Sequence, residues 1–126
     1  MPHVRRVDPA LFADPRARAV QRLLDRSTGA RNVSVSYIQT PPGEGSPEGL
    51  HVHQVDQIFY VVSGTMGVEI GGVTSEVGPG SLIVFPAGIG HRNWNAGPVP
   101  TAHLNILAPL PDPDLPFATP APPAGS

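Results

Sequence analysis

The sequence predicts a single all-β domain, a jelly-roll-like barrel, with one short N-terminal helix and a proline-rich C-terminal tail. The chain has 126 residues, which is enough for one modest hydrophobic core. Proline (17 residues) and glycine (14 residues) are so frequent that a helical bundle is disfavoured, because both residues interrupt helices. Short β-like runs recur between turn signals, which is typical of a sandwich or barrel.

The N-terminal segment, residues 1–29, is predicted to be an arm that ends in a short helix. Asp14 suits the N-cap, Pro15 suits the first helical position, and apolar residues follow at helical spacing to about Arg26. Most of the arginines of the chain fall between residues 5 and 31. We interpret them as a solvated helix face, with an arm that binds an anion or a partner as the alternative.

The middle segment, residues 30–108, is predicted to form the barrel. The first strand begins near Asn32, where Val33, Val35 and Tyr37 recur with a period of two. Further strands are expected at 50–53, 57–62, 66–70, 73–77, 81–85, 91–95 and 101–107.

The C-terminal segment, residues 109–126, is predicted to be an extended tail outside the sheets. Its many prolines lack the N–H group that a sheet ladder requires. A floppy tail is one interpretation, and docking of Leu115 and Phe117 onto a neighbouring subunit is the other.

Composition excludes several classes of function. The net charge of −2 argues against nucleic acid as a partner. The absence of cysteine excludes disulfides and thiolate metal sites, and the absence of lysine excludes Schiff-base chemistry. No apolar run is long enough to suggest a membrane partner. A soluble, cytoplasmic protein is therefore the expectation.

Three of the five histidines are spaced for metal binding. His51 and His53 share one face of a predicted strand, because side chains alternate along a strand. Gln57 begins the next strand, and His91 follows a Pro-x-Gly turn. Three imidazoles that converge inside a barrel suit a divalent transition metal, although hydrogen-bonded histidines with no metal are the simpler alternative.

The spacing of these residues resembles the two sequence motifs of the cupin family. The first motif, G-x5-H-x-H-x3,4-E-x6-G, is matched by Gly45, His51, His53, Gln57 and Gly64. The second motif, G-x5-P-x-G-x2-H-x3-N, is matched by Gly80, Pro86, Gly88, His91 and Asn95. The resemblance covers roughly residues 30–108 and leaves out the predicted helix and the tail.

The resemblance implies a double-stranded β-helix barrel, usually a homodimer, that holds one divalent ion of Fe, Mn, Ni, Cu or Zn. The implied metal ligands are His51, His53 and His91, with Gln57 in the position where glutamate is more common. A neutral amide leaves the positive charge of the ion unquenched, which favours an anionic substrate and leans the preference toward Zn, Cu or Ni. Gln57 either ligates the ion or hydrogen-bonds a water on it.

The candidate catalytic residues are Gln57, His103 and Tyr60. His103 shares one face of its predicted strand with Asn105 and Leu107, and this face lines either the pocket or the solvent. The opposite face of that strand is apolar, so it is expected to face the core or a dimer partner. Asn93 shares a face with His91, and Asn95 is interpreted as support for the turn.

The implied function is that of a small metal-dependent enzyme acting on a chelating small molecule. With Fe, Cu, Ni or Mn, the resemblance implies a dioxygenase-type oxidation, and with Zn it implies Lewis-acid cyclisation or isomerisation. The alternative is a non-catalytic cupin that binds or senses a small molecule.

Overall fold

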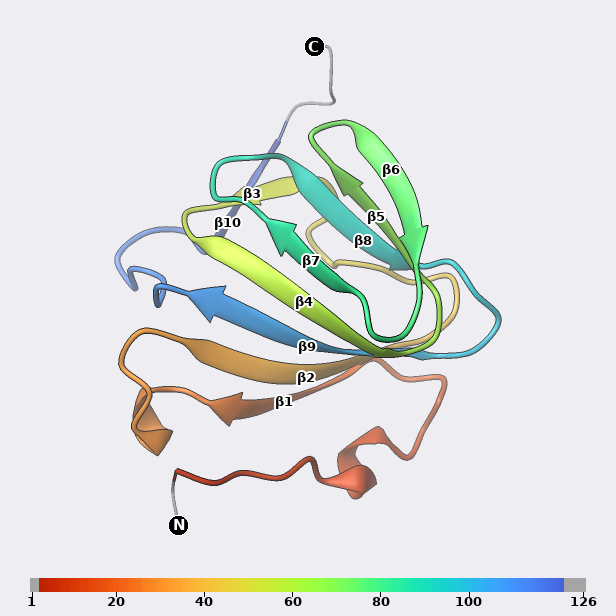
Figure 1. Cartoon of the computed structure of the whole chain (residues 1–126), viewed down its shortest axis with the longest axis horizontal. Coiled ribbons are helices and arrows are strands. Elements are labelled where there is room, and N and C mark those ends of the chain that lie inside the picture. The colour runs from red at the N-terminus through yellow and green to blue at the C-terminus, as the bar shows by residue number, and fades with distance from the viewer. Residues whose placement is uncertain (1–2, 122–126) are drawn as a thin grey trace.

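The computed structural model describes residues 3–121, which form two antiparallel five-stranded sheets facing each other (Figure 1). The first sheet has the order β1 (Ala19–Leu24), β2 (Ser34–Thr40), β9 (Thr101–Ala108), β4 (Asp56–Ser63) and β7 (Leu82–Phe85). The second sheet has the order β10 (Ala118–Pro120), β3 (His51–His53), β8 (His91–Asn95), β5 (Met66–Ile70) and β6 (Val73–Val77). The predicted all-β double-stranded barrel is confirmed.

The predicted N-terminal helix is wrong, because the second half of that segment forms the edge strand β1. This strand pairs with β2, so that Ala19 lies opposite Gln39 and Arg22 lies opposite Ser36. An irregularity between Arg22 and Leu24 shifts the register, so the apolar residues lose strict alternation and mimic helical spacing. Pairing with the free edge of β2 overrides that local pattern.

Helical structure in residues 3–121 is limited to two 3₁₀ turns, Pro9–Phe12 and Arg26–Thr28. No helix in this part of the chain is long and apolar enough to cross a membrane.

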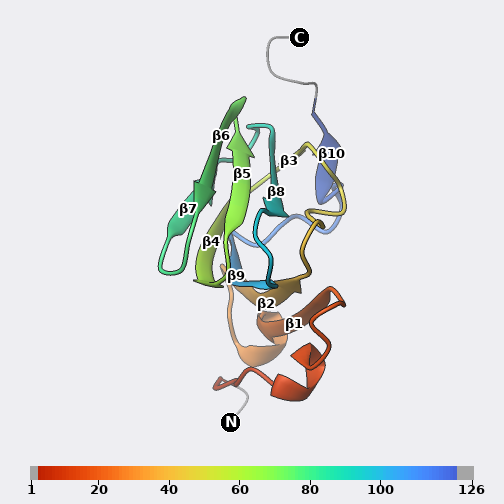
Figure 2. The same ribbon diagram turned by 90° about the vertical axis from the view of Figure 1, so that its right-hand side faces the viewer.

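The proline-rich tail does contribute a strand, which corrects the expectation that it lies outside the sheets. Strand β10 pairs with β3, with Ala118 opposite His53 and Pro120 opposite His51 (Figure 2). A proline is tolerated there because β10 is an edge strand. Phe117 packs against His53 of its own chain, and docking of Leu115 and Phe117 onto a neighbouring subunit stays a prediction. The last five residues of the predicted tail, 122–126, lie outside the described part.

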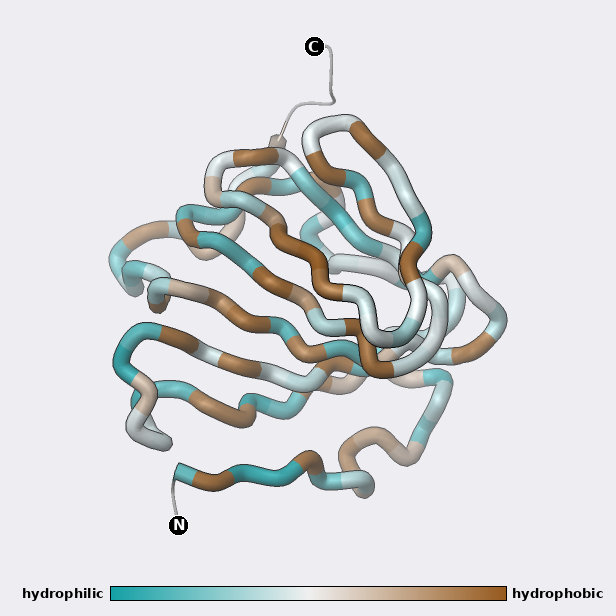
Figure 3. Tube along the Cα trace, viewed as in Figure 1, coloured by the Kyte–Doolittle hydropathy of each residue, from teal (hydrophilic) through white to brown (hydrophobic). Residues whose placement is uncertain are grey.

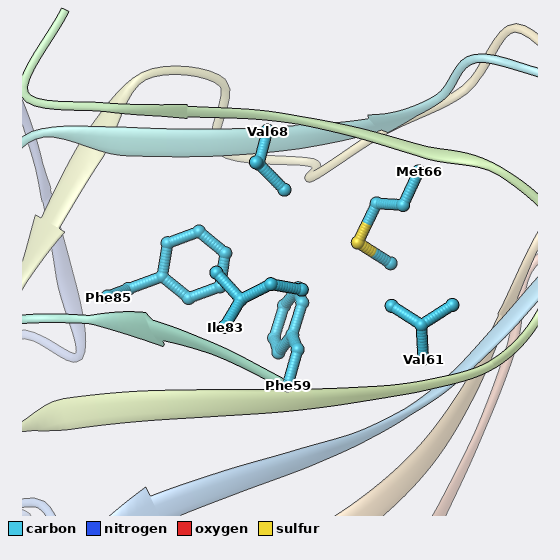
Figure 4. Packing of buried hydrophobic residues seen from close by; sticks show 6 residues of the cluster. All are labelled: Phe59, Val61, Met66, Val68, Ile83 and Phe85. Carbon is cyan, nitrogen blue, oxygen red and sulfur yellow. The ribbon is translucent and has the colours of Figure 1, made fainter. Parts of the chain in front are cut away.

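The hydrophobic core fills only one end of the space between the sheets. Strands β4 and β7 contribute aromatic and aliphatic side chains that meet two residues of β5 (Figure 4). The six buried residues of this cluster are Phe59, Val61, Met66, Val68, Ile83 and Phe85. Each such side chain contributes about 1.5–3 kcal/mol through burial. The other end, between β2, β9 and β3, is left for a cavity.

Strand β7 is apolar along its whole length, as its continuous brown colour shows (Figure 3). Ile83 and Phe85 are buried in the core, whereas Leu82 and Val84 are exposed on the outer face of the sheet. The barrel therefore carries apolar side chains on both sides of this strand.

Candidate metal centre

The three candidate ligands are placed by two neighbouring strands of the second sheet. Side chains alternate along the three-residue strand β3, so His51 and His53 both turn inward, whereas Val52 between them does not. The only register pair between β3 and β8 is His51 opposite His91. All three imidazoles are buried, with exposed fractions of 2–3%.

The turn before β8 delivers His91 to the other two histidines. Gly88 adopts a φ of +78°, which only glycine adopts at low cost. The Gly88 N–H donates to the His53 carbonyl at 3.0 Å. The Ala87 N–H donates to the Asp56 carboxylate at 2.9 Å, so the turn is tied to both β3 and β4.

Each ligand histidine has its Nδ1 against a backbone carbonyl. His53 Nδ1 lies 2.8 Å from the carbonyl of Phe117, and His91 Nδ1 lies 3.1 Å from that of Ile89. His51 makes the same contact with Gly49. Because a carbonyl only accepts hydrogen bonds, we assign the proton to Nδ1 in all three rings. Each Nε2 then presents a lone pair, as metal-binding histidines do.

The Nε2 atoms converge at a spacing that fits one metal ion. His51 Nε2 and His53 Nε2 are 3.1 Å apart, and the ligand atoms of His51, His53 and His91 all lie within 4.8 Å of one another. Metal–nitrogen bonds of about 2.0–2.1 Å imply nitrogen pairs about 3.0–3.4 Å apart. Lone pairs that face each other at this distance repel unless a cation lies between them. The donor set therefore fits a divalent transition metal.

Gln57 adds a fourth acceptor atom to this cluster. Its Nε2 donates to Oδ1 of Asn105 at 2.9 Å, which turns its Oε1 toward His91 Nε2 at 3.1 Å. With the His91 proton on Nδ1, these two atoms are both acceptors. The structure thus places the Gln57 carbonyl oxygen beside the imidazole ligands, and ligation by Gln57 stays a prediction.

Burial keeps two of the candidate ligands, His53 and His91, in their neutral, metal-binding form. Desolvation lowers the pKa of His91 to about 4, although the Ile89 carbonyl opposes this effect. Desolvation also lowers the pKa of His53, against the opposing effect of the Phe117 carbonyl. Neutral imidazole is the form that binds a metal, so little proton competition is expected at pH 7.

A cavity of about 320 Å³ opens from the metal cluster along the inner face of the first sheet. His103 lines this cavity, is 1% exposed and packs against Phe59 with a centroid distance of 4.1 Å. Neither of its ring nitrogens has a hydrogen-bond partner within residues 3–121. The sequence left open whether His103 lines the pocket or faces the solvent, and in the structure His103 lines the pocket.

The other predicted site residues separate into two groups. Asn93 lines the cavity together with His51, His53 and Gln57. Asn95 points elsewhere, because its amide donates to the carbonyls of Thr40 at 3.0 Å and Val99 at 2.7 Å. Tyr60 is not brought to the site: it alternates with inward-facing Phe59 and is 39% exposed on the outer face of β4.

The apolar face of β9 also lies outside the barrel. Leu104 is opposite both Tyr60 and Tyr37 in the register, and both Leu104 and Ile106 are half-buried. Ala102, the third apolar residue of this face, is buried, so the expected burial is found for Ala102 and not for Leu104 and Ile106. Contact with a dimer partner stays a prediction.

Sequence reasoning missed two contributors to the site. One contributor is the row of Arg18, Val20 and Arg22, whose side chains line the cavity. Val20 and Arg22 lie on β1, and Arg18 is the residue just before it. Because this segment was predicted to be a helix, the alternation of these residues was not recognised. A period of two at these positions was the signal that could have found them. The contact of Phe117 with the site could not be read from the sequence, because it depends on pairing between β10 and β3.

Comparisons with known proteins agree with this geometry. The family described as "Cupin domain" (Cupin_2) matches residues 36–107. An uncharacterised protein of Streptomyces coelicolor is 32% identical over 62 residues, which span 49% of this chain and 57% of that protein. The chain thus matches little more than half of the length of this relative.

Two solved structures share the fold at the same level of identity. The polyketide cyclase RemF from Streptomyces resistomycificus has a TM-score of 0.66 and 26% identity, over 76% of this chain and 68% of its own. A putative sugar phosphate isomerase from Acidithiobacillus ferrooxidans has a TM-score of 0.65 and 26% identity, over 76% of this chain and 62% of its own.

Proposed function

Because this chain belongs to the cupin family, we propose that it is a metal-dependent enzyme that cyclises or isomerises a chelating small molecule. The observation that carries the proposal is the convergence of four acceptor atoms at the end of a cavity. These atoms are Nε2 of His51, His53 and His91 and Oε1 of Gln57. The likeness to a cyclase and to a putative isomerase supports this choice of chemistry.

The protein side chains divide the work of binding and proton transfer. His51, His53 and His91 would hold the ion through Nε2, and a bound ion would supply Lewis-acid polarisation of a substrate oxygen. The hydrogen bond from Gln57 to Asn105 fixes the direction of the Gln57 carbonyl. His103 offers one accepting and one donating ring nitrogen to the cavity, because burial lowers its pKa to about 4 and keeps it neutral.

Isomerisation needs only these groups. In an α-hydroxy carbonyl substrate, the C–H proton is removed, the C–H electron pair forms a C=C bond, and the carbonyl π pair moves onto the oxygen, which takes up a proton. The hydroxyl on the other carbon then loses its proton and becomes the new carbonyl, as a proton adds to the former carbonyl carbon. In this proposal His103 takes and returns the carbon-bound proton, and no oxidant is consumed. The buried position of this imidazole keeps bulk water from competing for the transfer.

A dioxygenase-type oxidation is the second candidate. Three histidine ligands leave coordination positions for both a chelating substrate and dioxygen, provided that the ion is Fe, Mn, Ni or Cu. A cupin that binds its ligand without turnover is the non-catalytic alternative.

Metal content is the first test of the proposal. Untagged protein purified without added metal should contain about one equivalent of a divalent transition metal by mass spectrometry, as one three-histidine site requires. His91→Ala should lose it. His3→Ala is the matched control, because His3 bonds the Thr28 carbonyl far from the cluster in sequence and should not affect metal content.

Solvent deuterium exchange then separates the candidate reactions. With metal-loaded protein, the C–H group of the chelating hydroxyketone acetoin should exchange faster than in buffer, and His91→Ala should abolish the gain. Oxygen uptake with a chelating phenol would instead favour the dioxygenase. Metal retained without exchange or oxygen uptake would favour a binding protein, and the absence of metal even after reconstitution would refute the proposal.

A further inference from the structure

Polar side chains in one cross-strand row line the cavity along the first sheet. Arg22 on β1 lies opposite Ser36 on β2, and Ser36 lies opposite Asn105 on β9. Directly opposite residues on one face of a sheet have Cβ atoms about 4.5–5.5 Å apart. Asn105 in turn accepts the hydrogen bond from Gln57. A continuous polar track therefore runs from the rim arginine to the metal cluster.

An unpartnered imidazole lies beside this track. His103 lies two residues before Asn105, on the same inward face of β9, and is 1% exposed. Leaving a buried polar group without a hydrogen bond costs about 1–3 kcal/mol. Within residues 3–121 both of its ring nitrogens lack partners, and His103 lines the cavity. A ligand group that enters the cavity can therefore supply the hydrogen bond that His103 lacks.

The charges around the cavity favour a negatively charged occupant. The lining includes the guanidinium groups of Arg18 and Arg22 and one carboxylate, that of Glu48. Arg18 is exposed at the rim of the cavity, and its charge, after burial, contributes to the lowered pKa of His103. Arg22 is not firmly paired: its Nη1 lies 3.8 Å from Asp25, and its side chain is 60% exposed. A divalent ion on neutral ligands adds further positive charge.

We propose that the substrate is a small organic acid, whose carboxylate binds Arg22 and Arg18 while its chelating oxygens face the metal cluster. This inference rests on the proposed function and names the substrate class of the same site. Arginine suits the role because its planar guanidinium binds a carboxylate through two parallel hydrogen bonds. Ser36, His103 and Asn105 offer hydrogen bonds to the part of the molecule between its two ends.

Two probes that differ only in a carboxylate test the inference. Catechol and 3,4-dihydroxybenzoate chelate through the same pair of oxygens, and each is titrated calorimetrically into zinc-loaded protein. We expect the acid to bind about ten-fold more tightly than catechol. The ratio should fall toward one in the Arg18→Gln, Arg22→Gln double variant, while its zinc content stays unchanged.

Arg92→Gln is the matched control. Arg92 is an exposed arginine on the second sheet, paired with Glu69 at 2.8 Å, and it does not line the cavity. The preference for the acid should survive in this variant. Equal binding of both probes to the wild type would overturn the inference and leave the metal site intact. A preference retained in the double variant would also overturn it, and failure of both probes to bind would count against the proposed function as well.

Discussion

The Nδ1–H of His53 donates to the backbone carbonyl of Phe117 at 2.8 Å, across 64 residues of sequence. The two rings also pack with their centroids 4.3 Å apart. One end of the proline-rich tail thus fixes the tautomer and the direction of a candidate metal ligand. Strand β10 begins directly after Phe117 and pairs with β3, which holds Phe117 next to His53.

Removal of the tail should therefore weaken metal binding. Truncation after Ala108 removes the Phe117 carbonyl, and loss of such an outer partner typically costs about 10–100-fold in metal affinity. Competition with a chromophoric zinc chelator measures the change. Phe117→Ala is the control, because it keeps the carbonyl and removes only the ring, so its loss should be smaller. Unchanged affinity in the truncated protein would show that the tail does not support the site.

Replacement of Gln57 by glutamate should tighten metal binding by about ten-fold, which corresponds to about 1.4 kcal/mol. The added negative charge lies where Oε1 now faces His91, and the Asn105 amide can rotate to donate to the new carboxylate. The same chelator competition checks this prediction. Gln57→Leu should weaken binding, because it leaves only the three imidazoles. Equal affinities for all three proteins would mean that residue 57 does not touch the ion.

Most of the barrel could be predicted because its information is local. Alternating residues and glycine turns locate each strand from β3 to β9 to within one residue at either end. Strand β1 keeps a period of two only as far as Arg22, because its irregular register breaks the alternation around Leu23, and the apolar residues then read as a helix. Strand β10 ends in a proline and forms only because the edge of β3 is available.

The candidate site also contains a part that depends on local sequence and a part that depends on contacts between distant segments. His51, His53 and His91 come together because their spacing and their turn are encoded nearby in the sequence. The contributions of Phe117 and Arg22 depend on pairings between distant segments, β10 with β3 and β1 with β2. The inward position of His103 follows from its parity with Asn105, but parity alone does not say which face of β9 is the inner one.

The outer face of the first sheet should form a homodimer contact. Strands β4 and β7 expose Tyr60, Val62, Leu82 and Val84 there, with exposed fractions of 39–71%. Apolar side chains gathered on one face mark an interaction surface. Light scattering after size exclusion should give twice the chain mass for the wild type and the monomer mass for Val84→Lys. Val73→Lys, at a 71% exposed position on β6, should stay dimeric. A monomeric wild type would contradict the prediction.

His103 should make the folded chain sensitive to acid. Burial, followed by the charge of Arg18, lowers the pKa of His103 from 6.5 to about 4 in the folded state. Between these values the unfolded chain binds the proton and the folded chain does not, so stability is present above pH 6.5 and falls as the pH drops. From pH 7 to pH 5 this loss amounts to about 2 kcal/mol.

Urea unfolding at the two pH values, with and without His103→Leu, isolates this contribution. Leucine removes the titrating group, so the variant should lose about 2 kcal/mol less free energy of unfolding between pH 7 and pH 5 than the wild type. At pH 7 the variant should be at least as stable, because it also removes two unpartnered buried nitrogens. An equal loss in both proteins would mean that His103 is protonated, or bonded to water, in the folded chain.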